Sequence, residues 1–568
     1  NSITAKIEGK KWKPGTTKTY MITEKNSNWN YIIQTTSPTA VAYDATQTGN
    51  YGITSYRQDP DGTQRPVAWK VKEYSFDNGA TWVKTIPANS WFTGLSRMQG
   101  NGSTAAEQGH ATVTKATLID LLAKRNNELK TATPLGSTSN PYDLSMHNYK
   151  GDNTNRSTAN SYLISAPGVY RIPLVYGNAI KNGNDNPSSY KTSNTGTYIL
   201  SNFQDHASHP ITDPWIEKTN SGANAGVDGA EIVWADAANL VHSLSIAHDG
   251  GNAFLDFEVT AADIQSGNAV VAVKKGGTIV WSWHLWFAPQ DALSTIAVTN
   301  HQGKIYNFTK ETLGWKPTQW SGSTSARTVK VKVEQTVANN GTKQVSEFTI
   351  TQNPGSVKTG ATTLYQFGRK DAFPGVTTTD IKQGSITENA GDNMSIMNGI
   401  QNPGSFYAWG PSWYSAPPTG YSYYNLWSAD NTTTGYNDNS VVKTVYDPSP
   451  VGFKMPANNA FTGFTADGQN GGTKNVDGTA NVQTYRNNFG HNFWTSSSKT
   501  ATIHFPASGY RDSSVGSLYV VGSDGIYWSA VPYSTTDGCD LGFGSGSVNP
   551  LGSSIRTFGY AARPVADE

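Results

Sequence analysis

The chain has 568 residues, which is long enough for several domains of roughly 150 residues each. Its formal net charge is +1, so the chain lacks the excess of positive charge that would attract nucleic acid or anionic lipid. A single cysteine excludes a disulfide framework and a thiolate metal cluster within the chain, and the 11% of aromatic residues argues against disorder.

A helix is the first regular element that the sequence predicts clearly. Apolar residues between Leu118 and Leu129 recur at helical spacing, with a threonine before them as the N-cap and Pro134 after them as a stop. We expect this helix to close an N-terminal β-sandwich-like domain, residues 1–135.

Strand patterns dominate the next region, residues 136–355. Val329–Val333 alternates apolar and polar residues, as a strand with one buried face does. Val270–Val273 and Ile279–Trp283 flank a Lys-Lys-Gly-Gly sequence, which predicts a β-hairpin with a glycine turn. These patterns predict a second β-rich, sandwich-like domain, which a linker near Asn353–Ser356 joins to the rest of the chain.

The composition changes in the last region, residues 360–568. Aromatic residues are more frequent there, and the glycine-rich segments expected to form loops are longer. Near its end Leu541, Phe543 and Val548 occupy the positions of inward-facing strand anchors. The residues between them are mostly small or polar, and glycine within strands weakens them. A strand face on which the scaffold fixes alternate residues and leaves the others free to vary would explain this mixture.

The candidate catalytic and metal-binding residues form no pattern specific for such chemistry. His206 and His209 stand near two aspartates but outside any Glu-x-x-His helix. Asp467 begins a loop that departs from the calcium-loop register. Cys539 has no histidine nearby in the sequence to support a thiolate nucleophile. We therefore expect no catalytic residue, no metal and no cofactor, although a carboxylate pair on distant strands of a glycoside hydrolase would leave no local pattern.

Five segments of the last region match those of a known family: Leu364–Gly375, Tyr424–Trp427, Asp447–Pro456, Phe505–Arg511 and Arg563–Val565. On these segments the region from Thr363 to Glu568 resembles the C-type-lectin-like domain of Bacteroidales surface proteins, which is related to the fold of the formylglycine-generating enzymes. The resemblance implies an α+β domain. The calcium and sugar motifs of true C-type lectins and the paired cysteines of those enzymes are missing, so the resemblance implies a recognition scaffold.

Four upstream segments match a second family: Ala132–Gly136, Pro141–Ser145, Pro173–Gly183 and Trp281–Trp286. On these segments the upstream chain resembles the fimbrillin-like stalk and tip proteins of type V pili. This resemblance implies two β-sandwich-like stalk domains. Together with the last region it implies a multidomain, mainly β protein.

The end of the chain contains a set of residues that we call the frame, because the resemblance given next implies that they are fixed. It includes Tyr527–Ser529, Leu541, Phe543, Val548–Leu551 and Arg563–Val565. This frame resembles the variable proteins of diversity-generating retroelements, in which a C-type-lectin fold displays residues encoded by mutagenised, adenine-rich codons. The resemblance implies a variable region at about 527–565 that forms a ligand-binding surface. Its candidate residues are all of types that an asparagine codon reaches by changes at adenines: Val531, Ser534, Thr536, Asp537, Cys539, Asp540, Gly542, Gly544, Ser547, Gly552, Ser553, Ser554, Ile555 and Phe558.

These resemblances imply a cell-surface, pilus-tip adhesin rather than an enzyme. Its expected ligand is a protein or a glycan on a host or neighbouring bacterial surface, with pilus subunits as further partners. Ile555 and Phe558 are the main large apolar contacts expected in the variable set, with Tyr533, Arg556 and Tyr560 beside them. Two alternatives stay open: a secreted or surface carbohydrate-active enzyme with β-sandwich modules, and a structural pilus subunit that completes a neighbour by strand addition.

The expected location is the cell surface or outer membrane, in association with a pilus. No run of apolar residues approaches the roughly 20 that a transmembrane helix needs, so we expect no membrane-spanning segment in this chain. The sequence begins at Asn1 and not at methionine, and we expect any export signal or lipid anchor to lie outside it.

Overall fold

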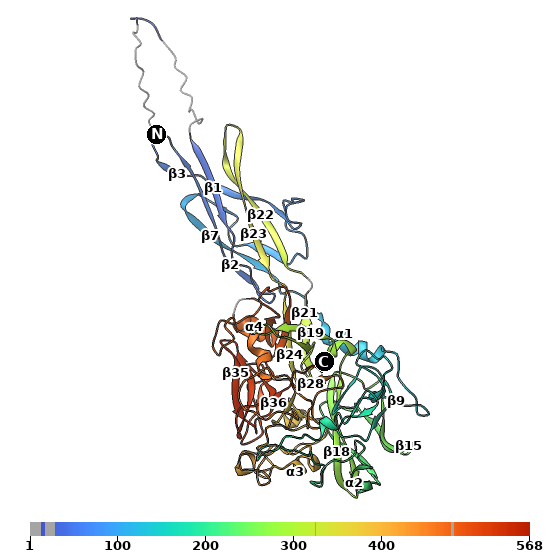
Figure 1. Cartoon of the computed structure of the whole chain (residues 1–568). Coiled ribbons are helices and arrows are strands. Elements are labelled where there is room, and N and C mark those ends of the chain that lie inside the picture. Colours follow the sequence, from blue (N-terminus) through green and yellow to red (C-terminus); the bar gives the residue numbers. More distant parts are fainter. Residues whose placement is uncertain (1–12, 18–28, 324, 479–481, 568) are drawn as a thin grey trace. The chain divides into compact units, whose positions relative to one another are not determined.

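The structure is a computed structural model that describes residues 13–17, 29–323, 325–478 and 482–567. It is a multidomain, mainly β structure in which the described helices are short. The chain divides into two compact units, each built from two chain segments (Figure 1). The smaller unit comprises Asn1–Leu118 and Ser323–Gly355, and the larger unit comprises Ile119–Gly322 and Ser356–Glu568.

The smaller unit is a sandwich of two antiparallel sheets (Figure 1). One sheet has the order β1-β2-β7-β5, with β3 also paired to β2: β1 (Asn30–Thr36), β2 (Gln47–Gln58), β7 (Ser103–Val113), β5 (Phe92–Leu95) and β3 (Gln64–Pro66). The other has the order β23-β22-β4-β6: β23 (Thr342–Gln352), β22 (Arg327–Asn339), β4 (Trp69–Ser75) and β6 (Gln99–Gly100). Side chains from both sheets form one core.

Strand β22 confirms the alternation that the sequence predicts at Val329–Val333. Its three valines are fully buried in the sandwich core, and the lysines between them point to the other face. The strand pairs with β4, so that Val331 lies opposite Tyr74. Residues 327–352 therefore complete the smaller unit, although they lie more than two hundred residues after it in the chain.

The larger unit contains several sheets, four described α-helices and several short 3-10 helices (Figure 1). Two sheets are built mostly from its first segment: β10 (Ser161–Ile164), β18 (Thr278–Phe287), β17 (Gly267–Lys275), β14 (Gly229–Ala235) and β27 (Gln383–Gly384) in one, and β15 (His242–Asp249), β16 (Asn252–Val259), β11 (Gly168–Pro173) and β9 (Tyr142–Asp143) in the other. The α-helices are α1 (Leu121–Thr131), α2 (Thr219–Gly222), α3 (Ile396–Gln401) and α4 (Val482–Asn488).

A six-stranded sheet dominates the second segment of this unit: β26 (Phe373–Pro374), β25 (Thr363–Tyr365), β36 (Tyr560–Ala561), β33 (Asp524–Pro532), β34 (Asp537–Gly544) and β35 (Val548–Ile555). Two smaller sheets contain strands from both segments. One consists of β19 (Thr295–Thr299), β20 (Ile305–Thr309), β37 (Val565–Ala566) and β28 (Phe453–Lys454), and the other of β24 (Ser356–Ala361), β21 (Lys316–Gly322) and β8 (Ile119–Asp120). Three pairs remain: β12 (Ile180–Lys181) with β13 (Asn184–Asp185), β29 (Gly490–Trp494) with β30 (Thr502–Pro506), and β31 (Tyr510–Arg511) with β32 (Leu518–Tyr519).

The hairpin predicted around Lys274–Gly277 is confirmed. Strands β17 and β18 pair antiparallel, with Lys275 opposite Thr278. Gly276 and Gly277 form the two-residue turn with φ angles of 55° and 85°. Positive φ at both positions matches the right-handed twist of the flanking strands and favours glycine there.

The structure places the domain boundaries differently from the expected 1–135, 136–355 and 360–568. Buried residues of both segments of the larger unit form a single hydrophobic core. Sheets also cross the expected boundary, because β14 pairs with β27 and β20 pairs with β37. The expected second and third domains, less the β22–β23 hairpin, therefore fold as one unit.

Helix α1 belongs to the larger unit and does not close the smaller one. It begins at Leu121, and its N-cap is Asp120, whose side chain accepts a hydrogen bond from the Ala123 amide, rather than a threonine. Within the helix Arg125 and Leu129 are buried. The Arg125 guanidinium forms a bidentate pair with Glu311, at 2.6 and 2.8 Å, which fixes the helix on this unit.

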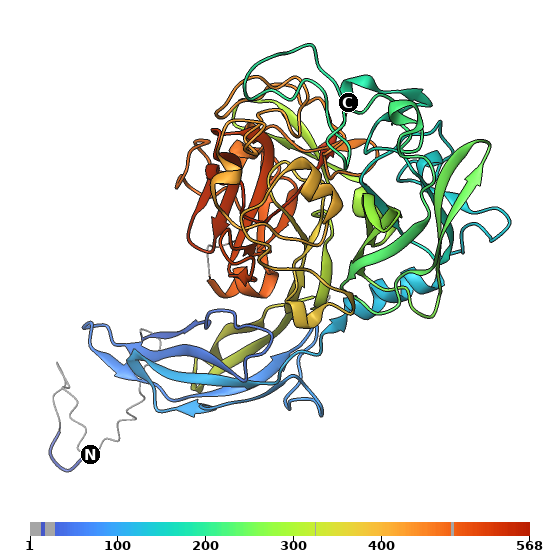
Figure 2. The same cartoon turned by 90° about the horizontal axis from the view of Figure 1, so that it is seen from below.

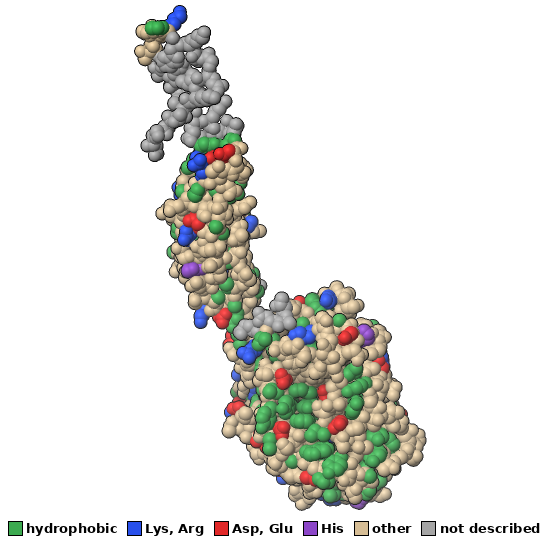
Figure 3. Space-filling view, turned by 90° about the vertical axis from the view of Figure 1, so that its left-hand side faces the viewer, with side chains coloured by type: hydrophobic (Ala, Val, Ile, Leu, Met, Phe, Trp, Pro, Cys, Tyr) green, Lys and Arg blue, Asp and Glu red, His purple; other side chains and the backbone are tan. Residues whose placement is uncertain are grey.

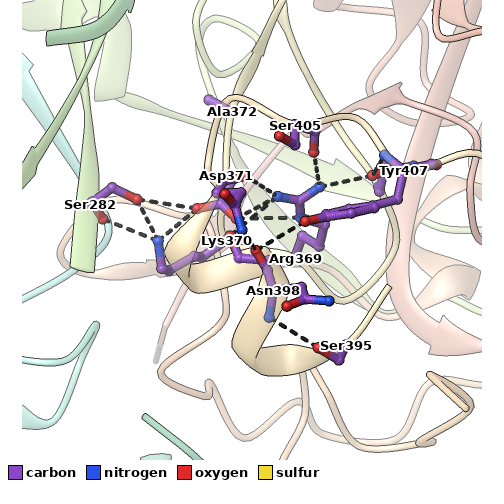
Figure 4. Close-up of polar contacts among 12 residues, drawn as sticks. Ser282, Arg369, Lys370, Asp371, Ala372, Ser395, Asn398, Ser405 and Tyr407 are labelled. Carbon is purple, nitrogen blue, oxygen red and sulfur yellow. Dashed lines mark hydrogen bonds and ion pairs between the residues drawn. The ribbon is translucent and has the colours of Figure 1, made fainter. Parts of the chain in front are cut away.

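A cluster of buried charges joins the two segments of the larger unit (Figure 4). The Asp371 carboxylate accepts hydrogen bonds from Lys370 Nζ at 2.6 Å and Arg369 Nη2 at 3.0 Å. Lys370 Nζ also donates to Ser282 Oγ on β18 at 2.6 Å. Burial acts to raise the pKa of Asp371, but the charges of Lys370 and Arg369 outweigh it and hold that pKa below its usual value.

We predict that Asp371→Asn lowers the free energy of unfolding by about 3–5 kcal/mol, because it leaves two buried cations without a counter-charge. The difference from wild type shrinks in acid: a carboxyl with a lowered folded pKa stabilises above its unfolded pKa of about 3.9, and this contribution is lost as the pH falls through the folded value. Guanidinium chloride unfolding of the full chain from neutral to acid pH measures both effects.

The matched control is Asp380→Asn, which removes a carboxylate that is 61% exposed. It should change the free energy of unfolding by less than about 0.5 kcal/mol, as surface substitutions do. A loss for Asp371→Asn no larger than that of the control would show that the cluster does not hold the two segments together.

Candidate ligand-binding surface

The predicted variable region contributes to four strands of the six-stranded sheet: most of β33, and all of β34, β35 and β36. Strands β33 and β34 pair antiparallel with Tyr527 opposite Leu541, and β35 then pairs antiparallel with β34. In Figures 1 and 2 these red strands lie on one side of the larger unit. The sheet thereby places the candidate residues of three strands and their connecting turns close together.

The frame residues face the core, as the sequence predicts. Leu541, Phe543, Val548 and Trp528 are all buried. The Phe543 ring lies 5.4 Å from the Phe493 ring and 6.0 Å from the Tyr527 ring, measured between centroids. The register is therefore the expected one for Leu541 and Phe543, which point inward. Trp528 lies opposite Asp540 and is buried on the other face of the sheet.

Eleven of the fourteen candidate residues are partly or fully accessible to solvent. We call this set the hairpin surface. It consists of Ser534, Thr536, Asp537, Gly542, Gly544, Ser547, Gly552, Ser553, Ser554, Ile555 and Phe558.

The other three candidates, Val531, Cys539 and Asp540, are buried, which corrects the expectation of one shared solvent-facing surface. Cys539 alternates with Asp540 along β34 and so faces the same side as Leu541, toward the core. Asp540 lies opposite Trp528, on the face where the Trp528 and Tyr560 rings pack with centroids 4.4 Å apart. Asp540 therefore occupies a position that simple alternation from Leu541 would expose, and side chains of the frame cover it.

The room for a side chain differs between the frame position Gly538 and the candidate position Gly542. A Cβ atom on Gly538, which is not a candidate, would lie 2.4 Å from the Phe367 ring, so only glycine fits there. A Cβ atom on the candidate Gly542 would meet nothing nearer than Asp540 Oδ1 at 3.9 Å. Gly552 is coupled to Asp540, since its Cβ atom would lie 2.1 Å from that same oxygen. A larger residue at 552 therefore requires Asp540 to move or to be replaced.

The buried Asp540 carboxyl is poorly matched to its surroundings. Its Oδ2 atom has no hydrogen-bond partner among the described residues. Burial, with a smaller effect of the Asp537 charge, raises the pKa of Asp540 to about 7. Burial likewise raises the pKa of the neighbouring Cys539 thiol, which keeps it protonated at neutral pH and unsuited to act as a nucleophile.

Arg556 supports the hairpin surface from beneath. Its buried guanidinium donates to the carbonyl oxygens of Tyr423 at 2.7 Å and Ser534 at 2.8 Å, and it lies 5.0 Å from the centre of the Phe367 ring. Tyr560 is also buried. The structure therefore corrects the expectation that Arg556 and Tyr560 contact a ligand: both hold the scaffold.

Phe558 has a structural role as well. Its ring packs between Tyr510 and Tyr560, with centroid distances of 5.4 and 5.3 Å. Ile555 is half-buried without such an aromatic cluster. Removing the Phe558 ring would thus cost packing energy, contrary to the expectation that it acts only as an exposed ligand contact.

Two exposed tyrosines adjoin the hairpin surface. Tyr533 is 41% exposed and Tyr436 is 37% exposed, and their ring centroids lie 5.2 Å apart. The Gly435 amide donates to the Pro532 carbonyl at 3.0 Å, which holds the loop of Tyr436 against the end of β33. Figure 3 shows hydrophobic side chains gathered on the side of the larger unit where β35 lies in Figure 1. Sequence reasoning missed Tyr436, because its loop lies about a hundred residues earlier and carries no local signal of this contact.

The earlier candidates for metal binding have ordinary structural roles. The Asp205 carboxylate accepts hydrogen bonds from the backbone amides of Ala207 and His209. Asp467 accepts one from the Gln469 amide within its loop. Among the described residues, no group of three or more His, Cys, Asp or Glu side chains is placed to hold a metal ion. In the described part of the chain, no helix is long and apolar enough to cross a membrane.

Comparison with known proteins bears on this same segment. The model of a domain of unknown function, DUF8237, matches residues 474–565. No curated protein and no solved structure matches the chain. The matched segment contains all fourteen candidate residues, from Val531 to Phe558, and so marks a recurring domain without assigning an activity to it.

We predict that Asp540→Asn raises the free energy of unfolding at pH 8 by up to about 4 kcal/mol, which is the cost of raising the pKa from 3.8 to about 7. A folded pKa above the unfolded one means that the folded state holds the proton between these two values. Wild-type stability therefore falls as the pH rises from about 4 to about 7 and stays low above that window. The variant lacks this fall.

Denaturation of the full chain at several pH values between 4 and 8 measures the effect. The exposed carboxylate of Asp380 provides the control variant Asp380→Asn, which should leave the pH dependence of stability unchanged. Identical pH dependence in wild type and Asp540→Asn would contradict the assignment of this titration to Asp540.

Proposed function

We propose that this protein is a cell-surface, pilus-associated adhesin that displays a diversified ligand-binding surface on a C-type-lectin-like scaffold. The hairpin surface binds a protein or a glycan on a host or neighbouring bacterial surface. In this proposal the chain is not an enzyme and uses no cofactor. The smaller unit is part of a stalk at the outer membrane surface, and pilus subunits are its partners.

The observation that carries the proposal is the contrast between frame and candidate positions on the same strands. Leu541 and Phe543 pack into the core, and Gly538 has no room for a side chain. Gly542, between them in the sequence, has room for one and lies on the accessible side. A scaffold that fixes alternate residues and leaves the others open is what a diversified surface needs.

The two buried polar candidates also support the proposal. A buried carboxyl with one unpartnered oxygen, such as that of Asp540, destabilises the fold, and selection for stability alone would remove it. Cys539 is a lone thiol that a smaller or apolar residue would replace without loss of a disulfide. Both are understandable as random outcomes at diversified positions, which the surrounding frame is stable enough to tolerate.

The composition of the hairpin surface indicates weak binding at each site. Its members are mostly Gly, Ser, Thr and Asp, which bury little area, whereas interface energy concentrates in Trp, Tyr and Arg. The exposed Tyr436 and Tyr533 are the large anchors next to it. Many copies on one cell compensate for a micromolar site, since linked sites raise avidity by roughly 10²–10⁴.

The DNA that encodes the chain tests diversification directly. We expect a second copy of the sequence that encodes residues 527–565, which differs from the gene at adenines and stands beside a reverse transcriptase gene. Related strains should then differ mainly at the fourteen candidate codons. Invariant candidate codons without any such copy would contradict the proposal.

A pair of glycine variants tests the scaffold. We predict that Gly542→Tyr changes the free energy of unfolding by less than about 0.5 kcal/mol, because its side chain enters open space. Gly538→Ala, the matched frame variant, should cost about 1–3 kcal/mol, because its methyl group meets the buried Phe367 ring. Denaturant unfolding of the full chain measures both. Equal effects of the two changes would show that frame and candidate positions do not differ.

A further inference from the structure

A concave candidate site lies elsewhere on the larger unit. It is a pocket of about 550 Å³ between the last turn of α1, the segment from β9 to Gly151, and residues 289–293. In Figures 1 and 2 this part of the unit lies on the other side from the red strands that carry the hairpin surface. The volume is typical of a small-molecule site, for which the range is about 300–1,000 Å³.

Aromatic rings form one wall of the pocket. The rings of Tyr142 and His147 stack with centroids 3.8 Å apart and planes 15° apart. Tyr149 also lines the pocket, and its ring centroid lies 5.7 Å from that of Phe453. His147 Nδ1 donates to the Asp143 carbonyl oxygen at 2.8 Å, which leaves Nε2 of the neutral ring as an acceptor. The wall is thus aromatic, and its rings are held in place by their contacts with one another.

Polar side chains stand at the rim of the pocket. Glu128, on α1, and Gln290 are exposed, and neither side chain forms a hydrogen bond or ion pair with another described residue. Lys150 is exposed there as well. The single negative charge of Glu128 and the single positive charge of Lys150 offset each other, so the pocket has no net charge of its own.

We propose that this pocket binds the terminal ring of a neutral sugar. One face of a pyranose ring consists of C–H groups, which pack well on the electron-rich face of an aromatic side chain. Its hydroxyl groups can donate to the Glu128 carboxylate and both donate to and accept from the Gln290 amide. This ligand therefore uses the aromatic wall and the unpaired polar rim together.

Other ligand classes use only part of the pocket. A purely apolar side chain of a partner protein would desolvate Glu128 and Gln290 without offering them hydrogen bonds, which is costly. A phosphorylated or carboxylated ligand would face the Glu128 carboxylate with only Lys150 to offset the repulsion. The chemistry of the lining thus favours an uncharged polyhydroxyl ligand.

The test is titration of the full chain with six neutral sugars (glucose, galactose, mannose, fucose, xylose and N-acetylglucosamine) and, separately, with the anionic sugar sialic acid. Calorimetry and saturation-transfer NMR measure the binding. We expect at least one of the neutral sugars to bind. Glu128→Ala should weaken that sugar about tenfold, which corresponds to one lost hydrogen bond to a charged group. Ala132→Trp, which places a large side chain in the pocket, should abolish binding.

Three controls make the outcome decisive. Glu258→Ala removes an exposed glutamate on β16 that does not line the pocket, and it should leave the affinity unchanged. Ile555→Gly, in the hairpin surface, should also leave it unchanged, so that failure of this site and failure of the adhesin proposal are distinguishable. Melting temperatures of Glu128→Ala, Ala132→Trp and Glu258→Ala should match wild type. No binding by any of the six sugars, unchanged binding by Glu128→Ala and Ala132→Trp, or tighter binding of sialic acid than of every neutral sugar would overturn the proposal.

Discussion

The larger unit depends on the ion cluster of Arg369, Lys370 and Asp371, because it fixes two segments of chain against each other in a dry interior. Three buried charges are costly unless each finds partners, and here one carboxylate serves two cations while Lys370 reaches Ser282 on β18. Only one relative position of the segments satisfies all of these bonds. The cluster therefore specifies the arrangement of the unit more than it contributes to its net stability.

Buried arginines extend the same principle to the rest of the second segment. Arg511 donates to the carbonyl oxygens of Pro374, Val376 and Gly516, and Arg563 to those of Thr309, Lys310 and His504. Arg556 does the same beneath the hairpin surface. A guanidinium can satisfy several loop carbonyls at once, so long irregular segments keep a defined path without regular secondary structure. This explains how strands with many glycines remain in place.

Local features of the fold could be predicted from the sequence, and long-range ones could not. Alternation at Val329–Val333, the Gly276–Gly277 turn and the anchors Leu541 and Phe543 are set by side-chain period and turn chemistry, which act over a few residues. The pairing of β22 with β4 and of β14 with β27 depends on contacts between residues about 150 or more positions apart in the chain, which no local pattern records. The burial of Asp540 was missed for the same reason, because the Tyr560 ring that covers its face comes from another strand.

One hydrophobic core lies beneath both candidate sites of the larger unit, and each site can therefore vary without change to the other. The hairpin surface places small residues on a sheet whose opposite face is filled by Phe543, Phe493 and Tyr527, so substitutions at accessible positions need not disturb packing. The pocket beside α1 draws on the same core through Leu129 and Tyr170 but shares no lining residue with the hairpin surface. Changes at one site are therefore expected to be additive with changes at the other, since separated sites without shared partners couple weakly. Under the proposed function, this separation lets the diversified surface change its ligand while the proposed pocket keeps its own.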